Sequence, residues 1–581
     1  MNPDTPIHPL GSRAKILLTS VFGPFAQDDE YGSRAINPME LYHNQVTREQ
    51  GPFSLRMFHR SFGLIIMKEN LDAPCTLLDF PDLERFESEL SHNSYDIVGI
   101  SSIMPNIGKV EKMCEMIRER LPHAVIVVGG HIANVPGLKE RIGADHVCKG
   151  DGVRWFRQYL GLDPNAPVRH PHVLSGFGTR ILGVGVEDSS RDTAAMLIPS
   201  VGCPVGCNFC STSALFGGKG KFVNFFETGD ELYAVMRELK DRHGVQSFFV
   251  MDENFLLHRA RALRLLELME ENHESWSLYV FSSARVLKSY SMEQLVRLGV
   301  SWVWMGIEGD ASTYRKLNGV DTRDLVNELQ SHGIRVLGST IIGLENHTPE
   351  NMDEVIDHAV IHDTVFHQFM LYTPLPGTPF YEHHRENGTL LGEDECPAAD
   401  SHGQCRFNYV HEHIRGGQET GFLREAFRRD FAVNGPSLAR MVRVMISGWK
   451  RYHDHPDACV RARMLREMGE LKTTYAGALW AMTRWYRGDR AMHAKLKEIL
   501  RELYALFGLK ARIAAPLMGL YAYFALAREE GRLRRGWTYE PPTFCEKNAR
   551  ALEQEMPVPA HAEPAPLRQP ALRPQAVSRQ S

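Results

Sequence analysis

Several features that would place this chain in a simple class are absent from it. Positive charge is not in excess, since 66 Lys and Arg stand against 71 Asp and Glu and the formal charge is −5. This balance argues against a protein that mainly binds nucleic acid. The first twenty residues lack the long apolar run and small-residue cleavage site of a signal peptide. We therefore expect a cytoplasmic protein with reduced thiols and no nucleic-acid partner.

Strong compositional bias is absent as well. Hydrophobic residues make up 43% and charged residues 24% of the 581 residues, which excludes a wholly disordered chain and a fibre. At about 150 residues per domain, the length predicts three or four domains. A disulfide scaffold is excluded by the length and the expected compartment, although ten cysteines are present.

The first region, residues 1–170, alternates short apolar runs with helical stretches. Runs that are apolar on both faces and separated by helices predict a doubly wound, Rossmann-like parallel sheet. Such sheets bind ligands beyond the carboxyl ends of their strands. The expected strands are Ala14–Ser20, Cys75–Phe80, Asp96–Ser101, Ala124–Gly130 and His146–Cys148.

Small residues follow these expected strands, at the edge where a ligand would bind. They allow a large ligand to approach the backbone closely, although ordinary tight turns would need the same residue types. The candidates are Ser101, Ser102, Gly129, Gly130, Gly150 and Gly152.

A second series of strands and helices occupies residues 180–391. Six βα units predict a partial (βα)6 TIM-like barrel with its site at the carboxyl ends of the strands. The expected strands are Met196–Ser200, Ser247–Met251, Ser277–Ser282, Trp302–Ile307, Val336–Ile342 and Phe366–Tyr372.

Residues 392–555 predict an α-helical C-terminal domain. Within it, Ile513–Ala527 carries no charge and is flanked by basic residues. This stretch is short for a membrane span, so we favour a buried core helix, with an interfacial membrane contact as the alternative. Residues 556–581 are rich in proline and predict a disordered tail.

Three cysteines form the most specific motif in the chain. Cys203, Cys207 and Cys210 have the spacing C-x3-C-x2-C, which suits three thiolates that ligate three irons of one cubane cluster. A structural zinc site would need a fourth ligand nearby, and the motif has none. The fourth iron is left open for a substrate or cofactor. Cys396 and Cys405, nine residues apart, lack the spacing of a second cluster.

This motif, with Phe209 before its last cysteine, resembles that of the radical S-adenosylmethionine (SAM) superfamily. The resemblance covers residues 180–391. It implies a [4Fe-4S] cluster held by the three cysteines, SAM on the open iron, and an electron donor such as flavodoxin or ferredoxin. It also implies that SAM lies against Phe209, Asp252, Glu253, Asn254, Glu308, Ile341 and Gly343.

A doubly wound domain directly before such a barrel resembles the cobalamin-dependent subfamily. The resemblance implies that the loops with Ser101, Ser102, Gly129, Gly130, Gly150 and Gly152 hold the corrin and its nucleotide tail. The chain lacks the D-x-H-x-x-G motif that would mark a lower ligand of cobalt. His131 is a candidate for that role, although a structural histidine is the favoured interpretation.

The resemblance implies an enzyme that methylates an unactivated carbon through a 5′-deoxyadenosyl radical and methylcobalamin. One alternative is a radical enzyme that carries out cyclisation, rearrangement or C–C coupling with the same cofactors. A cobalamin-responsive regulator without catalysis is the other. The substrate is expected to be a small molecule, and the apolar stretch with basic flanks favours a hydrophobic one such as a lipid or isoprenoid.

Overall fold

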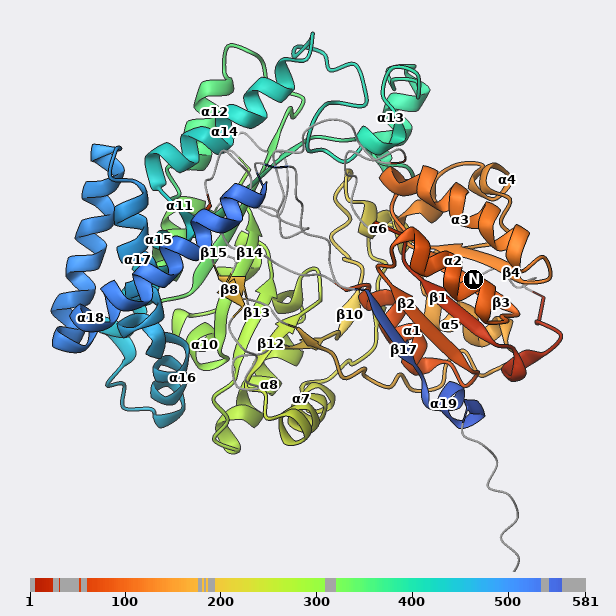
Figure 1. Cartoon of the computed structure of the whole chain (residues 1–581), viewed down its shortest axis with the longest axis horizontal. Helices are drawn as coiled ribbons and strands as arrows, with labels where there is room; N and C mark the ends of the chain where they lie inside the picture. The colour runs from red at the N-terminus through yellow and green to blue at the C-terminus, as the bar shows by residue number, and fades with distance from the viewer. Residues whose placement is uncertain are drawn as a thin grey trace, which may run out of the picture.

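A computed structural model of the chain shows two parallel sheets joined to a helical region (Figure 1). It describes residues 6–23, 31, 52–53, 60–175, 180–181, 184–185, 194–308, 320–533, 535 and 543–555. The predicted disordered tail at 556–581 lies outside these residues.

The first sheet has the strand order β17-β2-β1-β3-β4-β5. Its five parallel strands match the sequence prediction because four of them are short apolar runs buried on both faces, and the fifth, at the edge of the sheet, is half-buried. They are β1 (Ile16–Thr19), β2 (Cys75–Asp79), β3 (Ile97–Ser101), β4 (Val125–Gly129) and β5 (His146–Cys148). Helices α1 (Phe62–Asn70), α2 (Leu83–His92), α3 (Ile107–Arg120) and α4 (Leu138–Ile142) connect them, and α5 (Gly152–Tyr159) follows β5.

The sixth strand of this sheet was not expected from the sequence. β17 (Phe544–Lys547) comes from the far end of the chain and pairs antiparallel with β2. Figure 1 shows it in blue beside the red and orange strands. Arg60 and Lys68 both contact the Glu546 carboxylate at 2.6 Å, and α19 (Ala549–Glu555) follows. Residues near the C-terminus therefore belong to the first sheet, whereas the prediction assigned 392–555 to one helical domain.

The second sheet has the order β16-β15-β14-β13-β12-β9-β6 and forms an open, partial barrel. Its parallel strands are β9 (Ala194–Leu197), β12 (Ser247–Val250), β13 (Ser277–Phe281), β14 (Val300–Gly306), β15 (Arg335–Ile342) and β16 (Phe366–Leu371), and β6 (Leu174–Ser175) adds an antiparallel edge. The helices are α6 (Ser211–Leu215), α7 (Gly229–His243), α8 (Arg259–Glu271), α9 (Ala284–Leu287), α10 (Met292–Arg297), α11 (Thr322–Ser331), α12 (Met352–Val360) and α13 (Pro379–Glu386). The α/β fold class predicted from the sequence is thus confirmed.

Helices beyond the barrel pack against its outer face, on the left in Figure 1. They are α14 (Gln418–Asn434), α15 (Ser437–Tyr452), α16 (Ala458–Met468), α17 (Thr474–Trp485) and α18 (Arg490–Leu533). Asp430 and Arg440 form a fully buried ion pair at 2.8 Å between α14 and α15. Arg335 of β15 pairs with Glu467 of α16 at 2.8 Å, which fixes the helices to the barrel.

Helix α18 departs from the sequence prediction. The expected core helix at Ile513–Ala527 is wrong for one of its faces, where Leu517 and Phe524 are each 66% exposed. Non-helical backbone at Gly508 (φ 58°, ψ −137°) separates this part from the first half of α18. Residues Arg490–Arg528 are long and apolar enough to cross a membrane by length and composition, and only 22% of their most apolar window is buried.

Candidate active site between the two sheets

A cavity of about 860 Å³ lies between the carboxyl ends of the two parallel sheets. The first sheet contributes the loops that follow β1, β3, β4 and β5. The barrel contributes α6 and the residues after β9, β12 and β16. Both sheets therefore present to one space the edge at which α/β folds bind their ligands.

The structure brings all the predicted cobalamin-binding residues to this cavity. Ser101, Ser102, Gly129, Gly130, Gly150 and Gly152 all belong to its wall. These residues lie at the carboxyl ends of three different strands, β3, β4 and β5, or just after them, and the fold brings them together on one wall. This wall of small residues, continuous with a large cavity, fits a planar macrocycle such as a corrin.

The physical reason for these glycines differs from the one inferred from the sequence. A Cβ on Gly130 (φ +82°) would lie 2.6 Å from the carbonyl oxygen of Ser102. A Cβ on Gly152 would lie 2.5 Å from Sδ of Met67. Gly130 is therefore required by the close packing of the backbone itself, before any ligand binds, whereas a side chain at Gly152 would first have to displace the flexible end of Met67.

A loop on the barrel side carries the three cysteines. The short strands β10 (Ser200–Val201) and β11 (Val223–Asn224) pair antiparallel and close this loop at its base. Gly206 (φ +67°) allows the turn, because a Cβ there would lie 2.5 Å from the Cα of Lys219. The crossing of these two backbone segments fixes the position of the motif.

Local hydrogen bonds orient the cysteines themselves. The N–H of Cys210 donates to the carbonyl of Cys207 at 3.1 Å, and the Ser213 hydroxyl donates to the carbonyl of Cys203 at 3.1 Å. All three cysteines are half-buried, and burial raises the pKa of Cys203 to about 11. Three thiols on one tightly turned loop fit an iron–sulfur cluster, which Cys203, Cys207 and Cys210 would hold as thiolates.

Asp252, one of the predicted SAM contacts, is already occupied by neighbouring groups. Its Oδ2 lies 2.6 Å from Nη2 of Arg261 and accepts a hydrogen bond from the Ser200 hydroxyl. Its Oδ1 accepts the N–H of Asn254 at 3.0 Å. Both ionic side chains are almost fully buried, so Asp252 positions the loop after β12.

Glu253, the next residue, is the carboxylate of this loop that remains available to a ligand. It lines the cavity, and its Oε2 is buried without a hydrogen-bond partner in the described part of the chain. Burial, together with the charge of Asp252, raises the pKa of Glu253 to about 7. A carboxylate in this position would regain stability by pairing with a cationic group such as the SAM ammonium.

The remaining predicted SAM contacts do not line the cavity. Asn254 accepts a hydrogen bond from the Ser282 hydroxyl at 3.3 Å. Gly343 packs so closely that a Cβ would lie 2.3 Å from the Phe407 ring. Glu308, just after β14, and Ile341, near the end of β15, are both buried. Phe209 packs edge-on against the ring of Tyr372.

His131, the candidate lower ligand of cobalt, links the two halves of the site. It lies on the cavity wall, with Nε2 3.1 Å from the Thr212 hydroxyl oxygen of α6. Burial lowers the pKa of His131, which favours the neutral ring. The contact joins the loop after β4 to the helix that begins immediately after Cys210.

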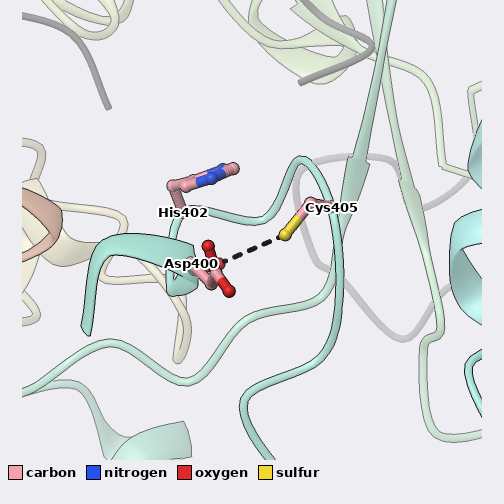
Figure 2. Close-up of side chains that lie close together, drawn as sticks. All are labelled: Asp400, His402 and Cys405. Atoms are coloured by element: carbon pink, nitrogen blue, oxygen red, sulfur yellow. Dashed lines mark hydrogen bonds between the residues drawn. The ribbon is translucent and has the colours of Figure 1, made fainter. Parts of the chain in front are cut away.

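A second cluster of potential ligands lies at the edge of the cavity. The ligand atoms of Asp400, His402 and Cys405 lie within 4.8 Å of one another, all on one loop (Figure 2). His402 lines the cavity, and both of its ring nitrogens are buried with no hydrogen-bond partner among the described residues. This loop therefore offers an imidazole to a metal ion or to a ligand in the cavity.

Sequence reasoning missed Arg261 and His402. The signal for Arg261 was present, since an arginine shares the apolar face of α8 with Leu265 and Met269 and must find a buried partner. The signal for His402 was weaker, because only its spacing from Asp400 and Cys405 distinguished it from the other histidines.

Known proteins resemble both parts of the chain that form the cavity. The family model "Radical SAM superfamily" matches residues 197–359, and "B12 binding domain" matches residues 64–160. An uncharacterised methyltransferase of Pyrococcus horikoshii is 25% identical over 357 residues, which are 55% of this chain and 75% of the relative. The bacteriochlorophyllide d C-8(2)-methyltransferase of Chlorobaculum tepidum is 22% identical over 362 residues, covering 58% and 78%. The anaerobic magnesium-protoporphyrin IX monomethyl ester cyclase of Cereibacter sphaeroides is 24% identical over 358 residues, covering 53% and 56%.

The fold and the site define an iron–sulfur enzyme whose barrel opposes a cobalamin-binding domain across one cavity. The chain contains a region that matches the radical SAM superfamily and, before it, a region that matches the B12 binding domain, in the order expected of a cobalamin-dependent radical SAM enzyme. The two matched domains imply a [4Fe-4S] cluster, SAM and cobalamin as the cofactors.

Proposed function

We propose that this enzyme transfers a methyl group to an unactivated carbon of a small, hydrophobic molecule. One observation carries the proposal: a single cavity joins the cysteine-bearing barrel to the glycine-lined edge of the first sheet. When bound, the cofactors supply a radical that removes hydrogen from carbon and a methyl group that replaces it. Two relatives named as methyltransferases support the same reaction class.

The residues of this chain bind and orient these groups. Cys203, Cys207 and Cys210 would hold the cluster, and Glu253 would pair with the SAM ammonium. Asp252 and Arg261 keep the Glu253 loop in place through their buried ion pair. The backbone turns at Gly130 and Gly150 shape the wall that the corrin would contact.

The cavity favours an apolar substrate. Most of its lining side chains are hydrophobic, including Phe80, Ile103, Met104, Phe216, Phe281 and Met370. Apolar side chains around the reacting groups would also limit contact with water, which protects a radical from side reactions. Small molecules with a large apolar skeleton are therefore the proposed substrate class.

Isotope transfer tests this proposal. Protein reconstituted without oxygen with iron, sulfide and cobalamin is incubated with reductant, SAM labelled in its methyl group, and an extract of apolar metabolites. We expect an extract component to gain the labelled methyl group, and Cys207→Ala to prevent the gain. If SAM is cleaved and a component changes without gaining label, methyl transfer is refuted in favour of cyclisation, rearrangement or C–C coupling.

A further inference from the structure

The second half of α18 bears an apolar face that no described element of the chain covers. Leu509, Ile513, Leu517, Tyr521 and Phe524 recur at spacings of three or four residues, so they form one stripe along the helix. Each is exposed, from 54% for Ile513 to 72% for Leu509. Met518 and Leu520, 42% and 48% exposed, widen the stripe. A continuous patch of this kind on a soluble surface marks an interaction site.

The opposite face of the same segment is fixed to the protein. Ala511, Ala515 and Ala522 are buried there, and Gly519 approaches α17 so closely that a Cβ would lie 2.5 Å from Cε3 of Trp480. Crossing a bilayer would strip α18 from α17 and expose this packed face. The segment is therefore suited to lie in the plane of a membrane surface and not to span it.

Charge around the stripe indicates which surface it meets. Residues 484–528 contain nine Lys and Arg but three Asp and Glu, whereas the whole chain carries a net charge of −5. Lys510 and Arg528, both exposed, are separated by about five helical turns. Lys510 lies about two turns before Leu517 and Arg528 about two turns after Tyr521, so both project on the side of the stripe, at its two ends. Long basic side chains in such places reach anionic headgroups while apolar neighbours enter the acyl region.

We propose that this face of α18 docks the enzyme on an anionic phospholipid bilayer. The stripe Leu509, Ile513, Leu517, Tyr521 and Phe524 would enter the interface, and Lys510 and Arg528 would contact the headgroups. The inference does not depend on the reaction catalysed.

Vesicle flotation of the full, cofactor-loaded chain tests the proposal. We expect binding to vesicles of equal phosphatidylcholine and phosphatidylglycerol, much weaker binding to phosphatidylcholine alone, and release by high salt. The triple change Leu517→Ser, Tyr521→Ser and Phe524→Ser should lower the partition coefficient by about 100-fold, since three large apolar contacts are lost. Lys510→Gln with Arg528→Gln should reduce the preference for the anionic vesicles.

A matched variant controls for general loss of surface apolarity. Ile361, Val433 and Leu465 are exposed on other elements, by 48%, 50% and 45%. Changing all three to Ser should leave flotation unchanged. Retained cobalamin and cluster spectra show that each variant is folded.

Several results would overturn the proposal. Wild-type protein that never floats with either vesicle would do so, as would equal loss of binding in the control variant. Resistance to alkaline carbonate extraction would show a spanning helix instead. A wild-type dimer in light scattering that becomes monomeric in the α18 triple variant, without vesicle binding, would assign the face to a second copy.

Discussion

The two parallel sheets form their sides of the cavity by different physical means. On the first sheet, shape dominates: a side chain at Gly130 would collide with the backbone of Ser102, and small residues line the rest of the wall. On the barrel, charge and sulfur dominate: one loop carries three thiols, and the loop after β12 carries Glu253 and the buried Asp252–Arg261 pair. The same topology thus provides a fitted wall on one side and reactive ligands on the other.

Because the two sheets contribute differently, substitutions in them should cause the loss of different cofactors. A steric change in the first sheet should remove one cofactor and leave the chemistry of the other side intact. Loss of a thiol or a buried charge in the barrel should do the reverse. Variants that affected both cofactors together would show that the two halves act as one unit.

The largest effect is expected from Cys207→Ala. With two of three thiolates left, the cluster should not assemble, so its broad absorption near about 400 nm and all SAM cleavage should disappear. Bound cobalamin, measured from its own visible spectrum after desalting, should remain. Full SAM cleavage in this variant would contradict the assignment of the motif.

Gly130→Val tests the opposite wall. Its Cβ would lie 2.6 Å from the Ser102 carbonyl oxygen, and φ is +82°, so the loop after β4 must move. We expect loss of cobalamin after desalting, with the cluster still formed. Gly137→Val is the matched control, because Gly137 also has positive φ but no atoms within 4 Å of its Cβ. Equal cobalamin loss in the control would show that strain alone, without the wall, causes the effect.

The sequence was sufficient for most of the framework. Strands such as Val125–Gly129 and Phe366–Leu371 were predicted within a residue or two, because short apolar runs between helices have few alternative interpretations. The cysteine motif also needed no structure, since its spacing alone specifies its chemistry. Both features depend on residues that are close together in the chain, so the sequence alone is enough to recognise them.

Features that depend on distant contacts could not be predicted in this way. The strand Phe544–Lys547 pairs with β2 across more than 400 residues, and no pattern near Glu546 identifies Arg60 and Lys68 as its partners. The apolar run around Leu517 is a helix, as predicted, but one of its faces is exposed and not part of the core. Hydrophobicity alone does not show whether another element covers a helix. Asp252 lines the cavity as a residue near SAM would, but no pattern showed that a buried arginine nine residues later pairs with it.

Arg261→Met tests how much the barrel depends on that buried pair. The change leaves the Asp252 carboxylate buried without its cation, so the free energy of unfolding should fall by about 3–5 kcal/mol. Arg261→Met with Asp252→Leu removes both charges and should recover much of the loss. Chemical denaturation of the three proteins measures this. Equal stability of wild type and Arg261→Met would show that the ion pair does not support the barrel.

Acid should weaken the barrel through its buried histidines. His347 accepts the backbone N–H of Gly343 at 3.0 Å, and burial lowers the pKa of His347 to about 4. Between pH 6.5 and 4 the unfolded chain takes up a proton that the folded ring refuses, so stability falls as the pH is lowered. The loss approaches about 3 kcal/mol for this residue. His347→Gln keeps an acceptor that does not titrate, and its unfolding free energy should depend less steeply on pH, with exposed His92→Gln as control. An unchanged slope in His347→Gln would contradict the assignment.

Glu253→Gln is expected to have the smallest effect and separates positioning from binding on the barrel side. Glutamine preserves the size of the side chain and one carbonyl acceptor, so the loop held by Asp252 and Arg261 should stay in place. It removes the negative charge that would pair with the SAM ammonium, and a charge-assisted hydrogen bond of this kind contributes about 1.5–3 kcal/mol. We therefore expect SAM to bind about 10- to 100-fold more weakly, with normal cluster and cobalamin content, when measured by equilibrium dialysis. Glu274→Gln, a change to a carboxylate on the far side of the barrel that pairs with Lys240, is the control and should bind SAM like wild type. Wild-type affinity in Glu253→Gln would show that another group holds the ammonium, and the barrel wall would then contribute cluster ligands and shape but no charge to SAM recognition.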